Sequence, residues 1–374
     1  MSGNGTKSGM LRPVQAARSL STRNLSGVTL YSPQELIISA RAGTPLAEIE
    51  AVVAERGQHI IAEPPDLSLL FGSSEPQTIG GIIATNLSGP RRVAWGAMRD
   101  HLLGVRAVTG RGEVIHSGGR VLKNVTGLDL CKLLAGSHGT LGIITEVTLK
   151  VLPAPEAVGT LVLPNLDAME GVRSLSAALG SPYSVSAAAW LPRDAAARVP
   201  ELAGFGSSVA LVRIEDFAAS VTYRTARLRD DLQHPATHIL DDGMSRAVWR
   251  SVRDLVPLPL AADDAVWRVS VRPSAGPTVF QTLTDAFGAR GFLDWGGGLV
   301  WIAGPATSAA HAAVEATASA AGGVWMLMRA PEPFRAAVLV VPPEPKALEC
   351  IRRRVKAALD PHAILNPGRM FAGL

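Results

Sequence analysis

The stretch TIGGIIATNLSGPRR, residues 78–92, combines the start of a buried helix with an abrupt end. Thr78 is a typical N-cap residue, and the isoleucines after it share one face of a helix. A run that contains Asn86 and Pro90 then favours a turn after about two helical turns. Two adjacent glycines leave bare backbone at the start of this helix, and two arginines follow its end. This combination of bare backbone, apolar side chains and positive charge suggests that the stretch binds a ligand and also contributes to the hydrophobic core.

The sequence around this stretch predicts a mixed α+β domain. Residues 27–41 contain two short strands, and residues 45–56 form an amphipathic helix with Thr44 as its cap and Gly57 after its end. Residues 110–112, Gly-Arg-Gly, separate two β-branched runs and predict a hairpin.

Beyond a proline-rich linker at residues 152–157, the pattern changes. Short strands alternate with amphipathic helices such as 216–233 and 307–321, which predicts an antiparallel α+β domain with helices on one face. No internal repeat is detectable. Trp295 and Trp301 bracket a glycine run, and we interpret them as core residues rather than ligand-facing ones.

Composition and charge are typical of a globular, cytoplasmic protein. Hydrophobic residues make up 47% of the 374 residues and charged residues 18%. The start of the chain is polar and glycine-rich, unlike a secretory signal, and no apolar run approaches the ~18 residues that span a bilayer. The net charge of +4 comes from dispersed basic residues, so we expect no nucleic-acid partner, although anionic partners or membrane headgroups remain compatible. Cys131 and Cys350 fit no metal or redox spacing.

Glycine-rich segments at residues 3–9, 78–92 and 136–144 indicate anion binding. Glycine lets backbone N–H groups converge on a phosphate. A helix that begins at Gly80 and Gly81 would also present free N–H donors and the positive end of its dipole. Neither a G-x-G-x-x-G after a strand nor a G-x-x-x-x-G-K-[ST] is present, which argues against Rossmann and P-loop folds. We therefore expect two loops that share the pyrophosphate of a nucleotide cofactor.

Several strings in the chain together resemble the FAD-binding, PCMH-type fold of the vanillyl-alcohol oxidase superfamily. Within that superfamily the resemblance is strongest to the GlcE-type subunits of bacterial glycolate oxidase. The strings are GNGTK (3–7), PPD (64–66), TIGGIIATNLSGPRRVAWGAMRDHLLGVRAVTGRGEV (78–114), VLKNVTGLDLCKLLAGSHGTLGIITEVTLKVLP (121–153) and ILNPGRM (364–370).

The resemblance implies an α+β fold with two domains. Residues 1–155 would form the FAD-binding PCMH-type domain, in which α+β subdomains hold FAD. Residues 156–374 would form an α+β cap domain with an antiparallel sheet that covers the isoalloxazine, and the tail at 360–374 would return to the FAD site.

The resemblance also assigns cofactor contacts to individual residues. The backbone at Asn4, Gly5 and Thr6, with the Thr6 hydroxyl, would bind the diphosphate, and residues 78–81 would be the second diphosphate-facing segment. The expected cofactor-binding residues are Asn4, Gly5, Thr6, Lys7, Thr78, Ile79, Gly80, Gly81, Asn86, Ser88, Gly89, Arg91, Arg92, Gly96, Arg99, Asp100, Gly139, Ile143, Ile144, Asn366, Pro367, Gly368 and Arg369.

The other members of this set have further implied roles. Residues 86–89 match the stretch that passes the flavin and ribityl chain, with one of the two following arginines as a charge near it. Residues 96–100 match the segment that orders that stretch, residues 143–144 lie beside the adenine in the family, and residues 366–369 match its NPG[KR] turn near the cofactor. FAD is expected to be non-covalent, because no histidine has a spacing typical of flavin attachment.

The start of the chain departs from the family pattern. Family members carry a strand–helix–strand of about one βαβ half-unit before the diphosphate loop, whereas this chain begins at that loop. We expect an N-terminally truncated first subdomain. Two explanations remain open, a start codon assigned too late or a genuine truncation, and either would weaken the support of the loop.

The absence of the metal-binding motif of the catalytic hydroxy-acid dehydrogenases is a second departure from the family pattern. Their H-x-G-D-G-N-x-H-like run is missing from the cap region. His234 and His238 have helical spacing, but Pro235 disfavours an unbroken helix between them, so we expect no metal site. His138 stands where the catalytic branch has glutamate, and we interpret it as an ordinary polar residue beside the cofactor.

The resemblance thus implies an FAD-dependent oxidoreductase subunit that acts on CH–OH groups, in a complex that oxidises glycolate to glyoxylate. The partners would be a sister flavoprotein of the GlcD type and an iron–sulfur subunit of the GlcF type, with peripheral membrane association through them. Because substrate machinery is missing, we expect this chain to relay electrons or support assembly, and no catalytic residue is assigned. The alternatives are a structural subunit that has lost FAD, and an independent flavin oxidoreductase for another 2-hydroxy acid.

Overall fold

The computed structural model describes residues 1–119 and 128–373, and the chain divides into two compact units. Residues 121–127, VLKNVTG, the first part of one motif string, lie outside the described residues. The units differ from the expected domains at three places. Residues 89–95 and Pro155 belong to unit 2, and residues 343–359 belong to unit 1. Unit 1 comprises Met1–Ser88, Gly96–Ala154 and Pro343–Leu374, and unit 2 comprises Gly89–Trp95 and Pro155–Pro342.

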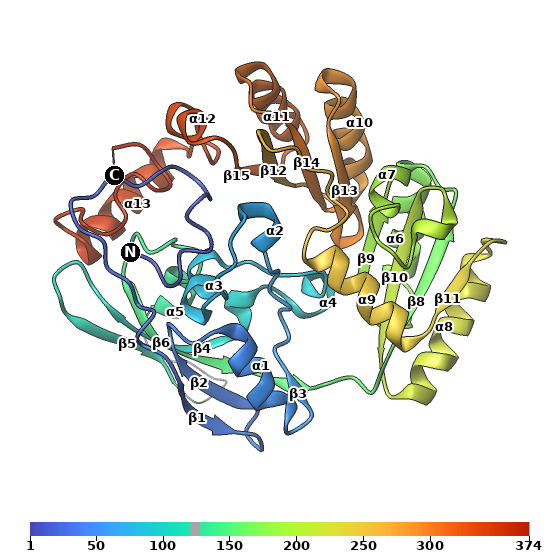
Figure 1. Ribbon diagram of the computed structural model, residues 1–374, viewed down its shortest axis with the longest axis horizontal. Helices are drawn as coiled ribbons and strands as arrows, with labels where there is room; N and C mark the ends of the chain where they lie inside the picture. Colours follow the sequence, from blue (N-terminus) through green and yellow to red (C-terminus); the bar gives the residue numbers. More distant parts are fainter. Residues whose placement is uncertain (120–127, 374) are drawn as a thin grey trace. The chain divides into compact units, whose positions relative to one another are not determined.

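Unit 1 is built on a five-stranded sheet. Its strands are β1 (Val28–Ser32), β2 (Ile37–Arg41), β4 (Leu102–Val108), β5 (Val114–Gly118) and β6 (Ile143–Lys150). They lie in the order β1-β2-β6-β4-β5, and each neighbouring pair is antiparallel (Figure 1). The predicted hairpin is confirmed between β4 and β5, where Gly112 has a φ of +81°.

The quoted stretch forms the central helix of unit 1. Helix α3 runs over Ile79–Thr85, the Thr78 side chain accepts from the Gly81 N–H, and Asn86 ends the helix in a left-handed conformation. This confirms the predicted cap and the predicted end. The three isoleucines of the helix are fully buried in a core shared with β2, β4 and β6. Burial of one such side chain stabilises a fold by roughly 1.5–3 kcal/mol, so these residues serve the core.

Short elements complete unit 1. They are α1 (Leu46–Ala54), β3 (Gln58–His59), α2 (Ser68–Phe71), η1 (Met98–His101), α5 (Leu130–Leu134), β7 (Leu152–Pro153) and α13 (Lys346–Leu359). The prediction that Thr44 caps α1 is wrong. Pro45 occupies the N-cap without a side-chain bond, and the Thr44 hydroxyl donates to the Arg41 carbonyl instead.

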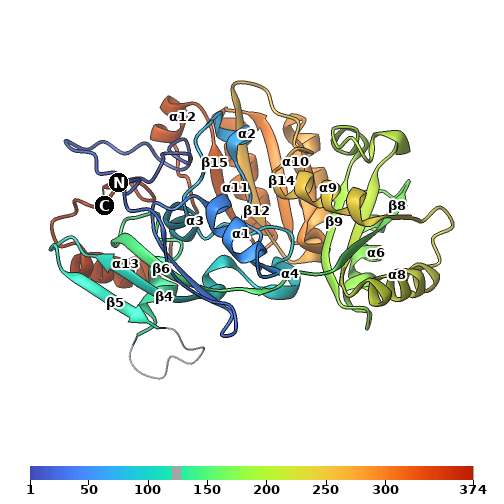
Figure 2. The same cartoon turned by 60° about the horizontal axis from the view of Figure 1, so that its bottom comes forward.

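Helix α13 docks the end of the chain on unit 1. The Gly110 N–H of the hairpin donates to the Leu359 carbonyl over 2.8 Å, and Figure 2 shows α13 beside β5. Lys356 Nζ lies 2.6 Å from the fully buried Asp360 carboxylate and also donates to the Thr140 carbonyl. The amino group of Met1 donates to Asn366 Oδ1, so the start of the chain lies next to the segment after α13 (Figures 1 and 2).

Unit 2 contains an eight-stranded sheet whose strand pairs are all antiparallel, as the sequence predicted. Its strands are β8 (Ala157–Pro164), β9 (Val185–Leu191), β10 (Val209–Asp216), β11 (His238–Leu240), β12 (Asp264–Ser270), β13 (Arg290–Asp294), β14 (Leu299–Pro305) and β15 (Val324–Arg329). Its helices are α4 (Arg92–Trp95), α6 (Ala168–Leu179), α7 (Arg193–Ala196), η2 (Ala203–Phe205), α8 (Ala218–Leu232), α9 (Asp242–Arg253), η3 (Pro273–Ala275), α10 (Gly276–Phe287), η4 (Trp295–Gly297), α11 (Ser308–Ala320) and α12 (Glu332–Ala337).

The sheet of unit 2 consists of two modules with the same succession of elements. One runs β8-α6-β9-β10-α8-β11, the other β12-α10-β13-β14-α11-β15, and each is a βαββαβ unit. The sheet order β11-β8-β10-β9-β13-β14-β12-β15 joins them through β9 and β13. This structural repeat was not visible in the sequence. Among the described residues, we find no helix with the length and apolar character to cross a membrane.

Candidate functional site

The glycine-rich N-terminal loop and the segment before α3 come together in unit 1. A β-carbon added to Gly3 would lie 2.3 Å from the Thr78 hydroxyl oxygen, so the backbone of Gly3 packs closely against the Thr78 side chain. The Asn4 side-chain amide donates to the Pro76 carbonyl over 2.9 Å. The bridge between Ser2 and Ser21 holds the start of the loop.

The backbone of this loop presents unused donors. Within the described part of the chain, no hydrogen bond uses the N–H groups of Asn4, Gly5, Thr6 or Lys7. Gly5 has a φ of +74°, a left-handed conformation that glycine adopts without strain, and open space surrounds the position of its missing β-carbon. Consecutive N–H groups around a left-handed residue are a common anion-binding arrangement.

Lys7 adds a positive charge to this loop. Only 9% of the residue is exposed, and its ammonium group donates to Gln77 Oε1 over 3.1 Å and approaches the Thr6 hydroxyl at 3.5 Å. Burial lowers the pKa of Lys7 to about 8, and the charge of Asp66 partly opposes this shift. Because Asp66 offsets only part of the cost of burial, the ammonium group would gain from a further anion bound beside it.

We expected the start of α3 to offer free N–H donors, and this expectation was wrong. The Ile79 N–H donates to the Thr44 carbonyl over 2.9 Å, and the Gly80 N–H donates to the Ala42 carbonyl over 2.8 Å. A β-carbon on Gly80 would lie 2.7 Å from the Ala42 β-carbon. Gly80 is therefore needed for the close approach of α3 to the chain after β2.

The C-terminal NPGR turn lies against the N-terminal loop. The Arg369 guanidinium donates to the carbonyls of Lys7 and Ser8 over 2.7 and 3.2 Å. These bonds use the carbonyl side of the loop and leave its N–H side free. Pro367 and Gly368 form the turn, in which Gly368 has a φ of +72°.

The turn also contacts the loop around His138. The Asn366 side chain donates to the His138 carbonyl over 2.9 Å, and a β-carbon on Gly139 would lie 2.9 Å from the same Asn366 amide nitrogen. Burial, together with the charge of Arg369, lowers the pKa of His138 to about 3. A histidine with so low a pKa binds a proton only weakly near pH 7, so His138 would be a poor general base.

Five expected site residues connect α3 to the following segment of unit 1. Asn86 Oδ1 accepts from the Arg99 N–H over 2.9 Å, and Ser88 Oγ accepts from the Met98 N–H over 2.8 Å. Asp100 packs under Gly96, which has a φ of +83°. These contacts fix the chain on both sides of residues 89–95.

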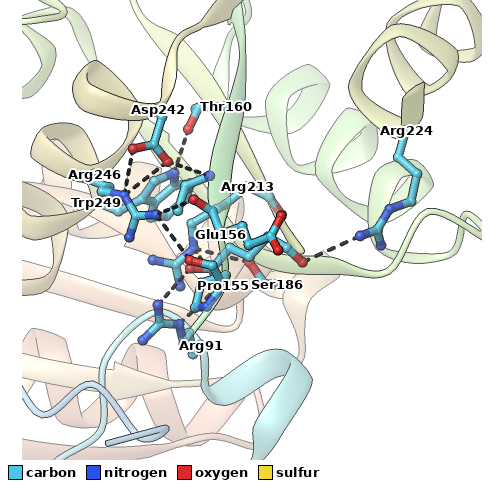
Figure 3. Close-up of polar contacts among 12 residues, drawn as sticks. Arg91, Pro155, Glu156, Thr160, Ser186, Arg213, Arg224, Asp242, Arg246 and Trp249 are labelled. Atoms are coloured by element: carbon cyan, nitrogen blue, oxygen red, sulfur yellow. Dashed lines mark hydrogen bonds and ion pairs between the residues drawn. The ribbon is translucent and has the colours of Figure 1, made fainter. Parts of the chain in front are cut away.

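Residues 89–95 themselves belong to unit 2, and Arg91 is used there. Its guanidinium makes a two-point ion pair with Glu215, with N–O distances of 3.0 and 2.7 Å. Arg213, which is almost fully buried, lies 3.4 Å from the same carboxylate. Figure 3 shows the side chains of Arg91 and Arg213 in one cluster of polar contacts. Burial alone would raise the pKa of Glu215, but Arg213 and Arg91 together hold it well below its ordinary value. Arg91 therefore anchors this segment to β10.

The remaining expected residues lie in different places. Ile144 is buried in the core of unit 1 and Ile143 is half-buried at the start of β6. Gly89 and Arg92 lie beside Trp295 in unit 2. Sequence reasoning missed Gln77, the acceptor for Lys7, although its position next to Thr78 was a signal for it.

The N-terminal loop, the segment before α3 and the C-terminal turn thus form one electropositive site in unit 1. It offers a buried ammonium and four N–H groups that have no partner in the described part of the chain, a combination that suits a diphosphate. FAD supplies redox chemistry, whereas these residues would bind and orient it.

Comparisons with known proteins identify the family of the chain. The FAD binding domain family matches residues 1–118. Glycolate oxidase subunit GlcE of Escherichia coli (strain K12) is 31% identical over 379 residues, which cover 100% of this chain and 92% of that protein. Glycolate oxidase subunit GlcD of Bacillus subtilis (strain 168) is 33% identical over 158 residues, which cover 42% of this chain and 35% of that protein.

A solved structure shows the same fold. The structure of alkyldihydroxyacetonephosphate synthase aligns with 95% of this chain and 68% of that one, with a TM-score of 0.63 and 20% identity. The chain therefore belongs to the FAD-binding, PCMH-type flavoproteins of the vanillyl-alcohol oxidase superfamily, in the group that contains GlcE, and its cofactor is FAD.

Proposed function

We propose that the chain is the FAD-binding subunit of a complex that oxidises glycolate to glyoxylate, in which it relays electrons rather than holding a substrate metal. Similarity to GlcE over the whole chain supports membership of such a complex. The partners would be a GlcD-like flavoprotein and an iron–sulfur subunit, and any membrane association would be peripheral through them.

The N-terminal loop is the observation that carries the relay role. A subunit that only supported assembly would have no need for a buried Lys7 beside four N–H groups without partners among the described residues, because the charge of Asp66 offsets only part of the free energy that burial of the ammonium group costs. FAD accepts electron pairs and releases single electrons, which is the chemistry required between a hydroxy acid and an iron–sulfur centre. The chain's own residues would bind the diphosphate non-covalently and hold the cofactor in place.

The test is glycolate oxidation by the complex, purified with its partner subunits and with different forms of this chain. We expect the complex without the chain to lose activity, and a complex with Lys7→Met, which binds FAD weakly, to assemble but oxidise glycolate slowly at limiting FAD. Lys346→Met, at an exposed position of α13, is the matched control.

The possible results of this assay distinguish an electron-relay role from a role in assembly alone. Full activity without this chain would refute the proposal. Full activity with a flavin-free Lys7→Met chain would refute electron relay and leave an assembly role.

A further inference from the structure

Unit 2 contains a pocket at one edge of its sheet, beside strand β11 (Figure 1). The volume of the pocket is about 420 Å³, which lies within the range of small-molecule sites in proteins. Its lining comes from three separate segments of the chain and consists of Pro164, Asn165, Glu201, Gly204, Phe205, Ala236 and His238. All of these residues belong to unit 2, so the pocket shares no residue with the diphosphate site of unit 1.

The backbone of all three segments is held in place by the fold itself. His238 begins β11, which pairs with β8. The N–H of Asn165, just after β8, donates to the Ser208 carbonyl over 3.0 Å. Phe205 ends η2, and its N–H donates over 3.1 Å to the carbonyl of the fully buried Leu202. The pocket is therefore preformed, and a preformed site binds its ligand with a smaller loss of conformational entropy.

Glu201 brings a carboxylate to this pocket that the fold does not use. Its Oε2 atom is buried, and no described residue donates a hydrogen bond to the carboxylate or forms an ion pair with it. An ionised carboxylate only accepts hydrogen bonds, and an unsatisfied buried acceptor costs free energy. A positively charged ligand with N–H groups would satisfy this acceptor and balance its charge.

Two aromatic rings also line the pocket. The ring centroids of Phe205 and His238 lie 5.1 Å apart, and the ring planes meet at 80°, which is an edge-to-face arrangement. The face of an aromatic ring attracts a cation. None of the seven described lining residues is a lysine or an arginine, so the lining has no permanent positive charge for an anion. The lining therefore favours a cation.

The same residues argue against a metal ion as this cation. A protein metal site usually supplies at least three ligands, whereas the pocket offers one carboxylate and one imidazole, from Glu201 and His238. In the described part of the chain, no group of three or more His, Cys, Asp or Glu side chains could hold a metal ion. An organic cation remains, because its apolar part can pack against the rings.

We propose that this pocket binds a small organic cation with N–H donors, of which a primary alkylammonium ion is the simplest example. Glu201 accepts the N–H hydrogen bonds, and the rings of Phe205 and His238 pack against the cation and its alkyl chain. The site goes beyond the proposed electron relay, which requires no pocket for a cation.

The test is binding of n-butylammonium chloride to the FAD-loaded chain, measured by saturation-transfer NMR and calorimetry. Sodium chloride at equal ionic strength controls for screening. Tetramethylammonium chloride is a cation without N–H donors, and sodium butyrate has a similar length and the opposite charge. We expect saturable binding of butylammonium, binding of tetramethylammonium that is at least about tenfold weaker, and no binding of butyrate.

Variants of the chain test the role of each lining group. Glu201→Gln should weaken butylammonium binding at least about tenfold, and Glu201→Asp, which keeps the charge on a shorter side chain, should have intermediate affinity. Phe205→Leu keeps an apolar wall but removes the ring face, so it should also weaken binding. Glu332→Gln is the matched control, because it removes the same charge at an exposed position of α12 and should leave binding unchanged.

Butylammonium that binds no better than butyrate would overturn the site, and so would full affinity in a folded Glu201→Gln chain, with folding checked by its melting temperature. Equal affinities for butylammonium and tetramethylammonium would overturn recognition through N–H donors. The comparison of the three ligands uses the unaltered chain, so it decides the question even if a variant fails to fold. None of these results depends on whether the chain relays electrons, because no lining residue belongs to the loop at residues 4–7.

Discussion

Replacement of Lys7 by methionine should stabilise the FAD-free protein and weaken FAD binding at the same time. Burial lowers the pKa of Lys7 from 10.5 to about 8. At about 1.4 kcal/mol per pKa unit, the buried charge costs the FAD-free protein about 3 kcal/mol near neutral pH. Methionine has a similar length and no charge, so we expect Lys7→Met to recover up to this amount, less the loss of the hydrogen bond to Gln77.

The pH dependence of this difference follows from the sign of the shift. The folded-state pKa lies below the unfolded-state value, so the charge penalty is complete below pH 8 and disappears as the pH rises from 8 to 10.5. The stability advantage of Lys7→Met should therefore be largest at pH 7 and shrink above pH 8. FAD affinity of the unaltered protein should fall over the same range, because the neutral amine no longer attracts the diphosphate.

The assay combines urea unfolding of FAD-depleted protein with FAD titration by flavin fluorescence. A charge-assisted hydrogen bond contributes about 1.5–3 kcal/mol, so Lys7→Met should bind FAD about 10- to 100-fold more weakly. Lys346→Met should change neither quantity. Unchanged FAD affinity would refute the assignment of Lys7 as a ligand of the diphosphate. A Lys7→Met protein that is less stable than the unaltered one at pH 7 would refute the claim that the buried charge destabilises the FAD-free protein.

Three further outcomes follow from the structure. Glu215→Gln should destabilise unit 2 by about 3–5 kcal/mol, because Arg91 would keep a buried charge without its partner; a melting temperature equal to that of the unaltered protein would contradict this. In the unaltered protein, the pKa of Glu215 is lowered, so the stability it contributes should be complete above about pH 4.5 and be lost only as the pH falls further; acid unfolding monitored by circular dichroism measures this. Gly80→Val should disrupt unit 1 and reduce flavin retention, because its β-carbon would lie 2.7 Å from that of Ala42. Gly81→Ala should retain FAD, because its β-carbon would have its nearest contact at 3.3 Å; equal flavin content in the two glycine variants would argue against this steric account.

The local structure of residues 78–92 could be predicted from sequence, but the hydrogen-bond partners of their backbone could not. Thr78, the isoleucine spacing and Asn86 define a capped helix through local rules. The acceptors for the N–H groups of Ile79 and Gly80 come from residues more than thirty positions earlier. A sequence pattern carries no information about which distant carbonyl reaches a helix end.

The arginines after the helix illustrate the same limit. Charge near a glycine-rich loop suggested a cofactor contact, but Arg91 pairs with Glu215, 124 positions away. The loop at residues 3–7 was assigned through family resemblance, because its glycine spacing alone fits no standard fingerprint. The two βαββαβ modules could not be predicted, because they share an order of elements without a detectable sequence repeat.

Hydrogen–deuterium exchange of the N-terminal loop, with and without FAD, tests the central claim most directly. The N–H groups of residues 4–7 have no protein partner in the described structure, so in FAD-depleted protein they should exchange rapidly. Saturation with FAD should protect these four positions strongly, while the already bonded N–H groups of residues 79 and 80 change little. Stoichiometric FAD binding with undiminished exchange at residues 4–7 would show that the diphosphate binds elsewhere.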